Sequence, residues 1–371
     1  MGSYLEPIKM AILAFPIIAI VLSLPIFLFQ YYRNGTFLRW NALVIYSFIL
    51  YMITAYFLVI LPLPDRDEVA KLTIPRYNIK PFQVVMEFIK HTSLDIKNPS
   101  TYLPALKESV VIQPVFNIFL TIPFGTYMRY IFKKSLKTTV LLSFCFSLFF
   151  ELTQLTGLYG YYPRSYRLFD VDDLFLNTLG GIIGYYLTPL ISRLFPRHDT
   201  LQNKIKTNAK KVTYVKRTVT FITDWILFSV LLSIVEMLFF KGHSSYFSGI
   251  LVFILYYYIV PAYIFDGQTI AKKITWIKMV NEDGSRITRR SLMIRQALFG
   301  VNCYIIIILL GNALEATGTV PDEQLDIALY TVFIIAGYAL IFILHILYNI
   351  VIKDNELAYE EFAKTTQISI K

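Results

Sequence analysis

Residues 138–157 read TTVLLSFCFSLFFELTQLTG, an apolar run in which Glu151 is the only charged side chain. A helix of about 20 apolar residues spans the roughly 30 Å hydrocarbon layer of a bilayer. Similar runs recur along the chain, which is 56% hydrophobic and has a mean hydropathy of +0.55. The sequence therefore predicts an all-α polytopic membrane protein, and it excludes a soluble enzyme.

About nine segments are long and apolar enough to be candidate spans. They cover residues 10–29, 41–61, 110–131, 138–157, 174–195, 219–240, 246–265, 297–311 and 328–352, of which the eighth has the shortest apolar core. A polar, Lys-rich segment separates the first five from the last four and is typical of a domain boundary. We therefore expect two helical modules. The predicted parts are a membrane domain over 1–195, a basic cytoplasmic linker over 196–216, a second membrane domain over 217–352 and a cytoplasmic tail over 353–371.

The distribution of Lys and Arg among the loops predicts the orientation. Residues 193–217 include eight of these cations and residues 266–295 include seven, whereas the loop before the last span has acidic residues and no Lys or Arg. Lys and Arg concentrate in cytoplasmic loops. We expect a multi-pass plasma-membrane protein with its N-terminus extracytoplasmic and its C-terminus cytoplasmic. Residues 62–109 and 164–173 then face the extracytoplasmic side.

The formal net charge of +10 fits this topology and contact with anionic lipid. Membrane lipid is thus an expected partner, and nucleic acid is not, because no recognition motif is present. Cys145 and Cys303 lie in apolar runs, which favours buried thiols over a disulfide framework. The four histidines lack the spacing of a zinc site. We expect no metal and no cofactor, and the sequence leaves the oligomeric state open.

Polar residues crowd together between residues 151 and 184. Charged groups inside a bilayer-length segment are costly unless they are paired or hydrated, so they are functional candidates. Glu151 and Gln154 share one helix face, and Asp173 and Asn177 share a face of the next helix. Together with Arg164 from the intervening loop, these positions predict an extracytoplasmic pocket lined by Glu151, Gln154, Asn177 and Arg164.

Two other interpretations of this region stay open. Glu151 with Arg164 or Arg167 could form a structural ion pair instead of a ligand site. Aspartates 170, 172 and 173 suit a solvated helix start that the helix dipole stabilises, or alternatively a cation site made of oxygen ligands.

Several motifs in this half match a known pattern in order and spacing. They are RYNIKPF at 76–82, Asn117 followed by PFG at 123–125, ELTQ at 151–154, and RLFDVDD at 167–173 followed by Asn177, Gly180, Gly181 and Gly184. This set resembles the VanZ-like family over about residues 10–195. The resemblance implies a bacterial plasma-membrane protein, and the family's founding member is associated with low-level resistance to teicoplanin, a lipoglycopeptide. The candidate ligand-binding residues are then Arg76, Asn78, Asn117, Glu151, Gln154, Arg164, Arg167, Asp170, Asp172, Asp173 and Asn177.

The second half has a pattern of its own. Arg217 and Asp224 are two helical turns apart, and FDGQT at 265–269 ends the seventh span. Residues 274–280 alternate like a strand, 281–284 suit a turn and 285–288 return, which predicts a small cytoplasmic β-hairpin. The order of these features, followed by Arg295, resembles the RDD family over about residues 212–311, although Ala271 replaces a usual Gly. The resemblance implies a small multi-span domain, and some members are reported as sodium/proton antiporters.

Arg217, Asp224 and Asp266 are therefore candidates for an ion pathway, and the alternative is a buried ion-pair network that orders helix ends. For the whole chain, the sequence favours non-enzymatic action at the extracytoplasmic surface on glycopeptide or lipid-linked envelope material, which lowers susceptibility to lipoglycopeptides. The alternative is sodium/proton antiport or other small-solute transport through the second half. An enzyme with Glu151 as general base would lack a nucleophile, a metal set and a recognised catalytic motif.

Overall fold

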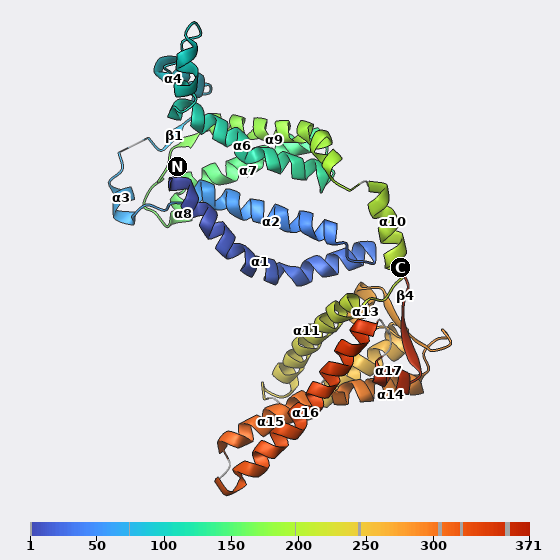
Figure 1. Cartoon of the computed structure of the whole chain (residues 1–371). Coiled ribbons are helices and arrows are strands. Elements are labelled where there is room, and N and C mark those ends of the chain that lie inside the picture. The colour runs from blue at the N-terminus through green and yellow to red at the C-terminus, as the bar shows by residue number, and fades with distance from the viewer. Residues whose placement is uncertain are drawn as a thin grey trace. The chain divides into compact units, whose positions relative to one another are not determined.

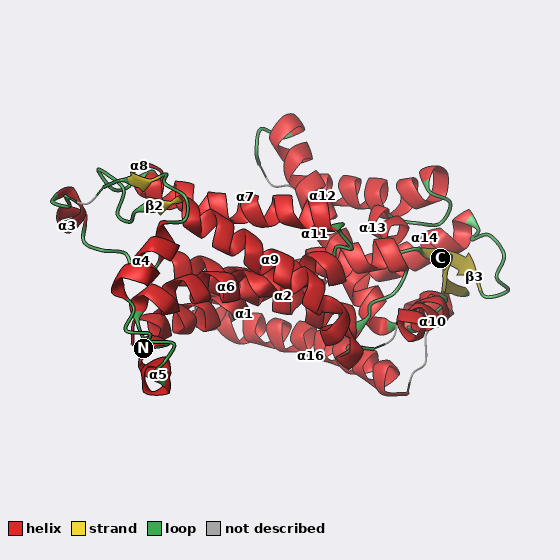
Figure 2. Ribbon diagram, turned by 90° about the horizontal axis from the view of Figure 1, so that it is seen from above, coloured by secondary structure: helices red, strands yellow, loops and turns green. Residues whose placement is uncertain are grey.

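The computed structural model describes residues 2–73, 75–196, 198–243, 246–302, 306–319, 322–352 and 357–371. Helices dominate these residues, and the strands form two-stranded sheets (Figures 1 and 2). The chain divides into two compact units. Unit 1 is Met1–Leu22 with Arg39–Thr200, and unit 2 is Ser23–Leu38 with Leu201–Lys371.

The long helices of unit 1 are α2 (Arg39–Ile60), α6 (Ser109–Tyr130), α7 (Leu136–Leu155) and α9 (Val171–Ile191), and α1 (Gly2–Asn34) contributes its first part. Shorter elements connect them: α3 (Arg66–Ala70), β1 (Tyr77–Asn78), α4 (Gln83–His91), η1 (Pro99–Thr101), α5 (Tyr102–Ala105), α8 (Gly157–Gly160), β2 (Phe169–Asp170) and η2 (Ser192–Leu194). The described residues of the connection between α2 and α6 therefore form short helices and a strand, and they include no long apolar helix.

Helices α6 and α9 lie against each other along their length (Figures 1 and 2). Glycines make this approach possible: a Cβ at Gly125 would lie 1.9 Å from the Gly181 carbonyl oxygen, and one at Gly184 would lie 1.9 Å from that of Ile122. Thr121 Oγ1 donates to the Asn177 carbonyl at 2.7 Å across the same contact. Small residues at helix interfaces allow backbones to pack closely, so this pair forms the rigid centre of unit 1.

Unit 2 contains α11 (Tyr214–Phe239), α12 (Tyr246–Phe253), which continues as a π-helical segment (Ile254–Ile264), and then α13 (Ile270–Ile274), α14 (Arg289–Gly300), α15 (Ile306–Thr319), α16 (Asp322–Ile352) and α17 (Ala358–Phe362). α10 (His198–Ala209) occupies most of the segment predicted as a linker. Phe228 of α11 packs against Val252, Tyr256 and Tyr257 to form an apolar core. This core fixes α11 against the α12 segment.

The small sheet of unit 2 differs from the predicted hairpin in its partner strand. β3 (Ile277–Asn281) pairs antiparallel with β4 (Thr365–Ser369), with Ile277 opposite Ser369. The predicted return strand makes only a single bridge, from Val280 to Arg286, although the turn before it forms, with Gly284 at φ +77°. Ile277 and Met279 are buried, so β3 needs an extended partner. That partner comes from the C-terminal segment, where the sequence predicts only a tail.

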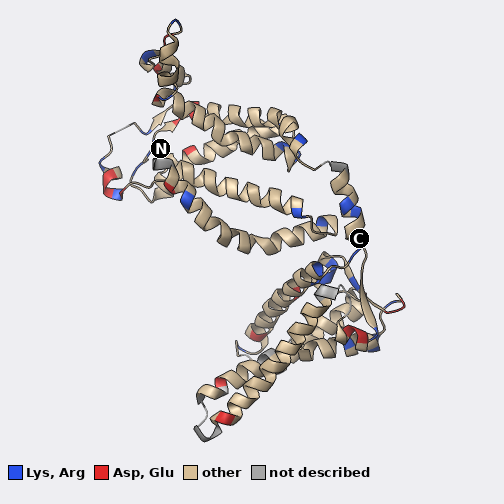
Figure 3. Ribbon diagram, viewed as in Figure 1, with Lys and Arg blue, Asp and Glu red and all other residues tan. Residues whose placement is uncertain are grey.

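Eight helices of the described residues are long and apolar enough to cross a membrane. They coincide with eight of the predicted spans, and the remaining one, 297–311, falls partly on residues 303–305, outside the described ranges. The protein is a multi-pass helical membrane protein. In unit 1, acidic residues gather near the start of α9, and basic residues mark the opposite helix ends, such as Arg39, Arg129 and Arg193 (Figure 3).

Candidate functional site

The start of α9 is joined to a segment about ninety residues earlier in the chain. β1 and β2 pair in parallel, with Asn78 opposite Asp170. Asn78 Nδ2 donates to both carboxylate oxygens of Asp170 at 3.2 Å, and Asp170 caps α9 by accepting from the Asp172 N–H at 2.9 Å. A carboxylate at this position satisfies a free N–H of the first helical turn. The pairing brings two of the sequence motifs to one place.

Asp172 connects α9 to α4. Its two carboxylate oxygens accept from the N–H groups of Phe82 at 2.6 Å and of Val84 at 2.8 Å. Phe82 adopts a φ of +66° just before α4 begins. Asp172 is buried, and it supplies acceptors that the first turn of α4 otherwise lacks. Its first role is therefore to place α4 over the start of α9.

A polar layer continues along α6, α7 and α9. Asn117 Nδ2 donates to Asp173 Oδ1 at 2.6 Å, and Asn177 Nδ2 donates to Ser147 Oγ at 2.8 Å. Glu151 is buried, and it accepts from the Asp170 N–H at 3.0 Å. The three helices thus share polar contacts at the end where the acidic residues gather.

A cavity of about 280 Å³ opens beside this layer. Its lining residues are Asn78, Gln83, Val84, Glu87, Ser109, Val110, Gln113, Pro114, Leu168, Asp170, Asp172, Asp173 and Leu176. Four of them are carboxylates, and none of these described lining residues is Lys or Arg. Burial raises the pKa of Asp170, and the charges of Asp172 and Glu87 raise it further, against hydrogen bonds from the Asp172 backbone and Asn78. This arrangement favours a positively charged occupant.

Four of the eleven candidate ligand-binding residues from the sequence line this cavity, namely Asn78, Asp170, Asp172 and Asp173. Glu151, Gln154, Asn177 and Arg164 do not line the cavity. Gln154 Nε2 donates to the Val59 carbonyl at 3.1 Å. These side chains contribute instead to the packing of the surrounding helices and loops.

The side chains of Arg164 and Arg167 donate hydrogen bonds to backbone carbonyl oxygens. Arg167 donates to Val59 at 2.8 Å and to Leu61 at 3.2 Å, and Arg164 donates to Leu72. Neither forms an ion pair with Glu151 among the salt bridges of the described residues. Arg76 is exposed, and its carbonyl accepts from the Phe169 N–H at 3.1 Å. Arg164 and Arg167 therefore hold the surrounding loops through hydrogen bonds to backbone carbonyls.

Sequence reasoning missed Glu87, Gln83 and Gln113 as lining residues. Gln113 is an amide inside a predicted span, so the rule that selected Gln154 could have found it. Glu87 and Gln83 lie in α4, in a region with no long apolar run. No feature of the sequence connects that helix with α9.

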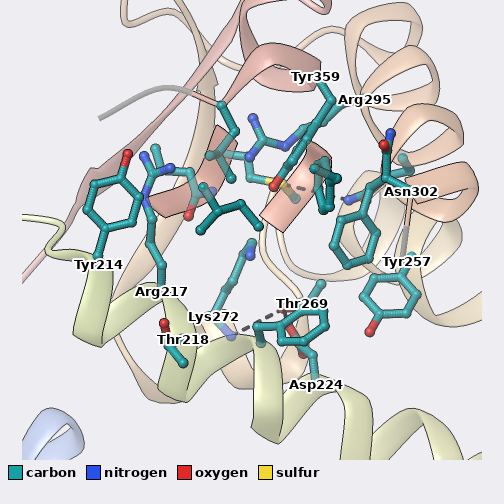
Figure 4. Close-up of a pocket in the computed structure, with 18 of the residues that line it drawn as sticks. Tyr214, Arg217, Thr218, Asp224, Tyr257, Thr269, Lys272, Arg295, Asn302 and Tyr359 are labelled. Carbon is teal, nitrogen blue, oxygen red and sulfur yellow. Dashed lines mark hydrogen bonds between the residues drawn. The ribbon is translucent and has the colours of Figure 1, made fainter. Parts of the chain in front are cut away.

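Unit 2 contains a larger pocket of about 440 Å³ (Figure 4). Arg217 and Asp224 both project into it from α11 (Figure 4), but they do not pair with each other. Arg217 binds Glu360 at 2.8 Å, and Arg295 also binds Glu360. Glu360 belongs to α17, in the segment predicted as a tail, and no sequence pattern singles it out.

Asp224 is buried and fully hydrogen-bonded. It accepts from Tyr256 Oη at 2.6 Å, from Thr269 Oγ1 at 2.7 Å and from the Ala271 N–H at 3.3 Å. Thr269 caps the short helix α13. Asp224 therefore holds the FDGQT segment against α11.

Asp266 has different partners from Asp224. It binds Lys278 and Arg286, each at 2.5 Å, and it does not line the pocket. The hydrogen bond and charge of Lys278, together with Arg286, lower the pKa of Asp266. Of the three predicted ion-pathway residues, the structure brings Arg217 and Asp224 to one pocket and places Asp266 in a half-exposed ion pair.

Comparison with protein families agrees with this division. Residues 48–192 match the VanZ/LLP1 family, and residues 212–348 match the RDD family. No curated protein and no solved structure matches the chain significantly. The chain joins a VanZ/LLP1 segment to an RDD segment, as the sequence resemblance predicts.

Proposed function

We propose that the VanZ/LLP1 segment is a non-enzymatic binding module at the extracytoplasmic membrane surface. It binds a cationic group of a lipoglycopeptide or of lipid-linked envelope material, and it thereby lowers susceptibility to lipoglycopeptides of the teicoplanin type. The observation that carries this proposal is the cavity whose four carboxylates face no Lys or Arg among its described lining residues.

Two of the four carboxylates are suited to contact a ligand. Asp170 and Asp172 are not among these two, because their carboxylate oxygens already accept backbone N–H groups at the starts of α9 and α4. The two suited carboxylates are Asp173, of which one oxygen accepts from Asn117, and Glu87, which is exposed on α4. A positive group placed between Glu87 and Asp173 would relieve the repulsion among these acids, which gives specificity for cations.

The test is selective protection of cells. Expression of the chain in a susceptible Gram-positive host should raise the inhibitory concentration of teicoplanin more than that of vancomycin. Glu87→Gln should reduce the protection about two- to fivefold, since exposed charge pairs contribute roughly 0.5–1 kcal/mol. The matched control is Glu68→Gln, the same change on exposed α3, away from the cavity.

If Glu87→Gln protects cells as well as the parent chain does, the cavity does not bind the drug. The same conclusion follows if Glu68→Gln loses as much protection as Glu87→Gln. If protection does not discriminate between the two drugs at all, the proposed function is wrong.

The alternative function is sodium/proton antiport through the RDD segment. One observation favours it: Asp224 is 2% exposed, lies in a candidate span and lines the 440 Å³ pocket. Carboxylates inside spans are typical of proton-coupled sites. Everted vesicles with a pH-sensitive dye should show sodium-driven proton release that Asp224→Asn abolishes. A signal that survives this substitution would make Asp224 a purely structural acceptor.

A further inference from the structure

Behind the polar residues that line the unit 2 pocket lies a carboxylate, Glu360, whose oxygens already accept hydrogen bonds from Arg217, Arg295 and Gln367. Glu360 is fully buried, and it accepts from Arg295 and Gln367 on one oxygen and from Arg217 and the Leu357 N–H on the other. Burial alone would raise its pKa, but the charges of Arg295 and Arg217 lower the pKa to about 2. Glu360 is therefore ionised and has no capacity for further donors.

Arg217 has donors left over at this site. Its side chain is 9% exposed and lines the pocket, yet only one of its terminal nitrogens binds Glu360. Nε and the other terminal nitrogen, Nη2, are buried without a hydrogen-bond partner in the described part of the chain. A guanidinium presents its donors as a planar fork that fits a carboxylate or a phosphate. Arg217 thus brings two unsatisfied donors to the wall of the pocket.

Lys272 adds a second cation to the pocket, next to Asp224 (Figure 4). Burial lowers the pKa of Lys272, and the charge of Asp224 opposes this effect. Asp224 is already held by Tyr256, Thr269 and Ala271. The cations Arg217, Lys272 and Arg295 outnumber the carboxylates Asp224 and Glu360 by one positive charge, so a single negative charge would balance the site.

The rest of the pocket is apolar. Its walls include Phe221 of α11, Phe299 of α14, and Ala339, Phe342 and Ile343 of α16. The volume of about 440 Å³ lies in the range of roughly 300–1,000 Å³ that is typical of sites for small organic ligands. Positive charge at one end and hydrocarbon walls at the other suit a ligand that has a negatively charged head and an apolar chain.

We propose that the RDD unit binds an amphipathic anion with a single hydrocarbon chain. Its carboxylate or phosphate head receives hydrogen bonds from the free donors of Arg217 and lies near Lys272, and its chain lies between α11, α14 and α16. The site is separate from the carboxylate cavity of unit 1. Its occupant has the opposite charge to the cation proposed there.

The experiment uses the full chain in phosphatidylcholine nanodiscs and a photoreactive fatty acid. After irradiation, peptide mapping should find the label on α11, α14 or α16 at the pocket walls. Unlabelled oleate or lysophosphatidate should compete, and the stronger competitor identifies the head group. Oleyl alcohol, which has the same chain without a charge, should compete at least tenfold less well.

Two variants separate binding from folding. Arg217→Gln removes the fork and should reduce labelling at least tenfold, whereas Arg290→Gln, the same change at an exposed position of α14, should not. Ala339→Trp fills the chain-binding end and leaves the Glu360 network intact, so it should reduce labelling with an unchanged melting temperature. Labelling that survives both Arg217→Gln and Ala339→Trp, or equal competition by oleyl alcohol, would overturn the proposal.

Discussion

Asp172, in the RLFDVDD motif, has a structural role that does not depend on a ligand. Both of its oxygens accept backbone N–H groups from Phe82 and Val84. The sequence marks Asp172 as polar and placed at a helix start, which is correct. It does not reveal that the donors lie about ninety residues earlier, because no local pattern encodes the parallel pairing of β1 with β2. The same limit applies to Asp170, whose partner Asn78 comes from β1.

The charged side chains of unit 2 show the same limit. The spacing of Arg217 and Asp224 correctly places both on one face of α11, where they line one pocket. Their partners are Glu360 for Arg217 and Tyr256 with Thr269 for Asp224. Spacing along a helix specifies a direction in space, whereas the partner depends on which other segment folds against that face.

The lowered pKa of Glu360 predicts that the stability of the folded protein depends on pH. Its pKa is about 2 in the folded protein, lowered from an ordinary 4.5, despite its burial, by Arg295 and Arg217. A lowered carboxyl pKa contributes stability that is fully present above pH 4.5 and is lost as the pH falls towards 2. The contribution is roughly 3 kcal/mol, since one pKa unit corresponds to about 1.4 kcal/mol.

The measurement is the free energy of unfolding of the purified protein between pH 6 and pH 3. The parent chain should lose stability in this acid range, and Glu360→Gln should be destabilised by about 3–5 kcal/mol at pH 6 because two buried arginines lose their counter-charge. The variant should also lose the part of the acid dependence that Glu360 supplies. Glu361→Gln, the neighbouring acid on exposed α17 surface, is the control. An equal pH profile in the parent and in Glu360→Gln would contradict the assignment.

At the level of elements, apolar periodicity and small residues predict most of what forms. The spans appear where their hydropathy places them, and the glycines of α9 meet α6 as small-residue packing predicts. The error concerns β3. Alternation in 274–280 correctly indicates a strand, but the nearby return segment makes only the bridge to Arg286, and β4 from the C-terminal segment forms the ladder. Strand patterns specify which side chains are buried, and they leave the partner open.

The contact between α6 and α9 gives a prediction about single methyl groups. A Cβ at Gly184 would lie 1.9 Å from the Ile122 carbonyl oxygen, which belongs to backbone and has little freedom to move. Gly184→Ala should therefore separate the helices and destabilise unit 1 by about 1–3 kcal/mol, the usual cost of overpacking. The measurement is thermal unfolding in detergent.

The matched control is Gly337→Ala, on α16, where no atom lies within 4 Å of the added Cβ. Since Ala also favours helix more than Gly does, this control should leave the melting temperature unchanged or raise it. Similar destabilisation by both substitutions would show that the α6–α9 approach is not the cause.

For the whole molecule, two family segments with different chemistry occupy one chain. The VanZ/LLP1 unit offers carboxylates at its cavity, and the RDD unit offers an excess of cations at its pocket. Hydropathy and Lys/Arg counts predict two modules, and the family matches at residues 48–192 and 212–348 lie on either side of the predicted linker. The positions of the cavities depend on α4, α13 and α17, which are short helices without a hydropathy signal.

The orientation of the chain is the prediction on which the proposed function of unit 1 depends. Residues 193–217 carry eight Lys and Arg, whereas the loop before the last span carries none, and such a bias sets topology. Single cysteines at Tyr161, Lys204 and Gly318, in a chain lacking Cys145 and Cys303, place a thiol at three exposed positions between the predicted spans. An impermeant maleimide applied to whole cells should label positions 161 and 318 and leave 204 unlabelled, although lysed cells should label 204 as well. Labelling of 204 on intact cells would invert the topology, place the Glu87 and Asp173 cavity in the cytoplasm, and remove it from any extracellular glycopeptide.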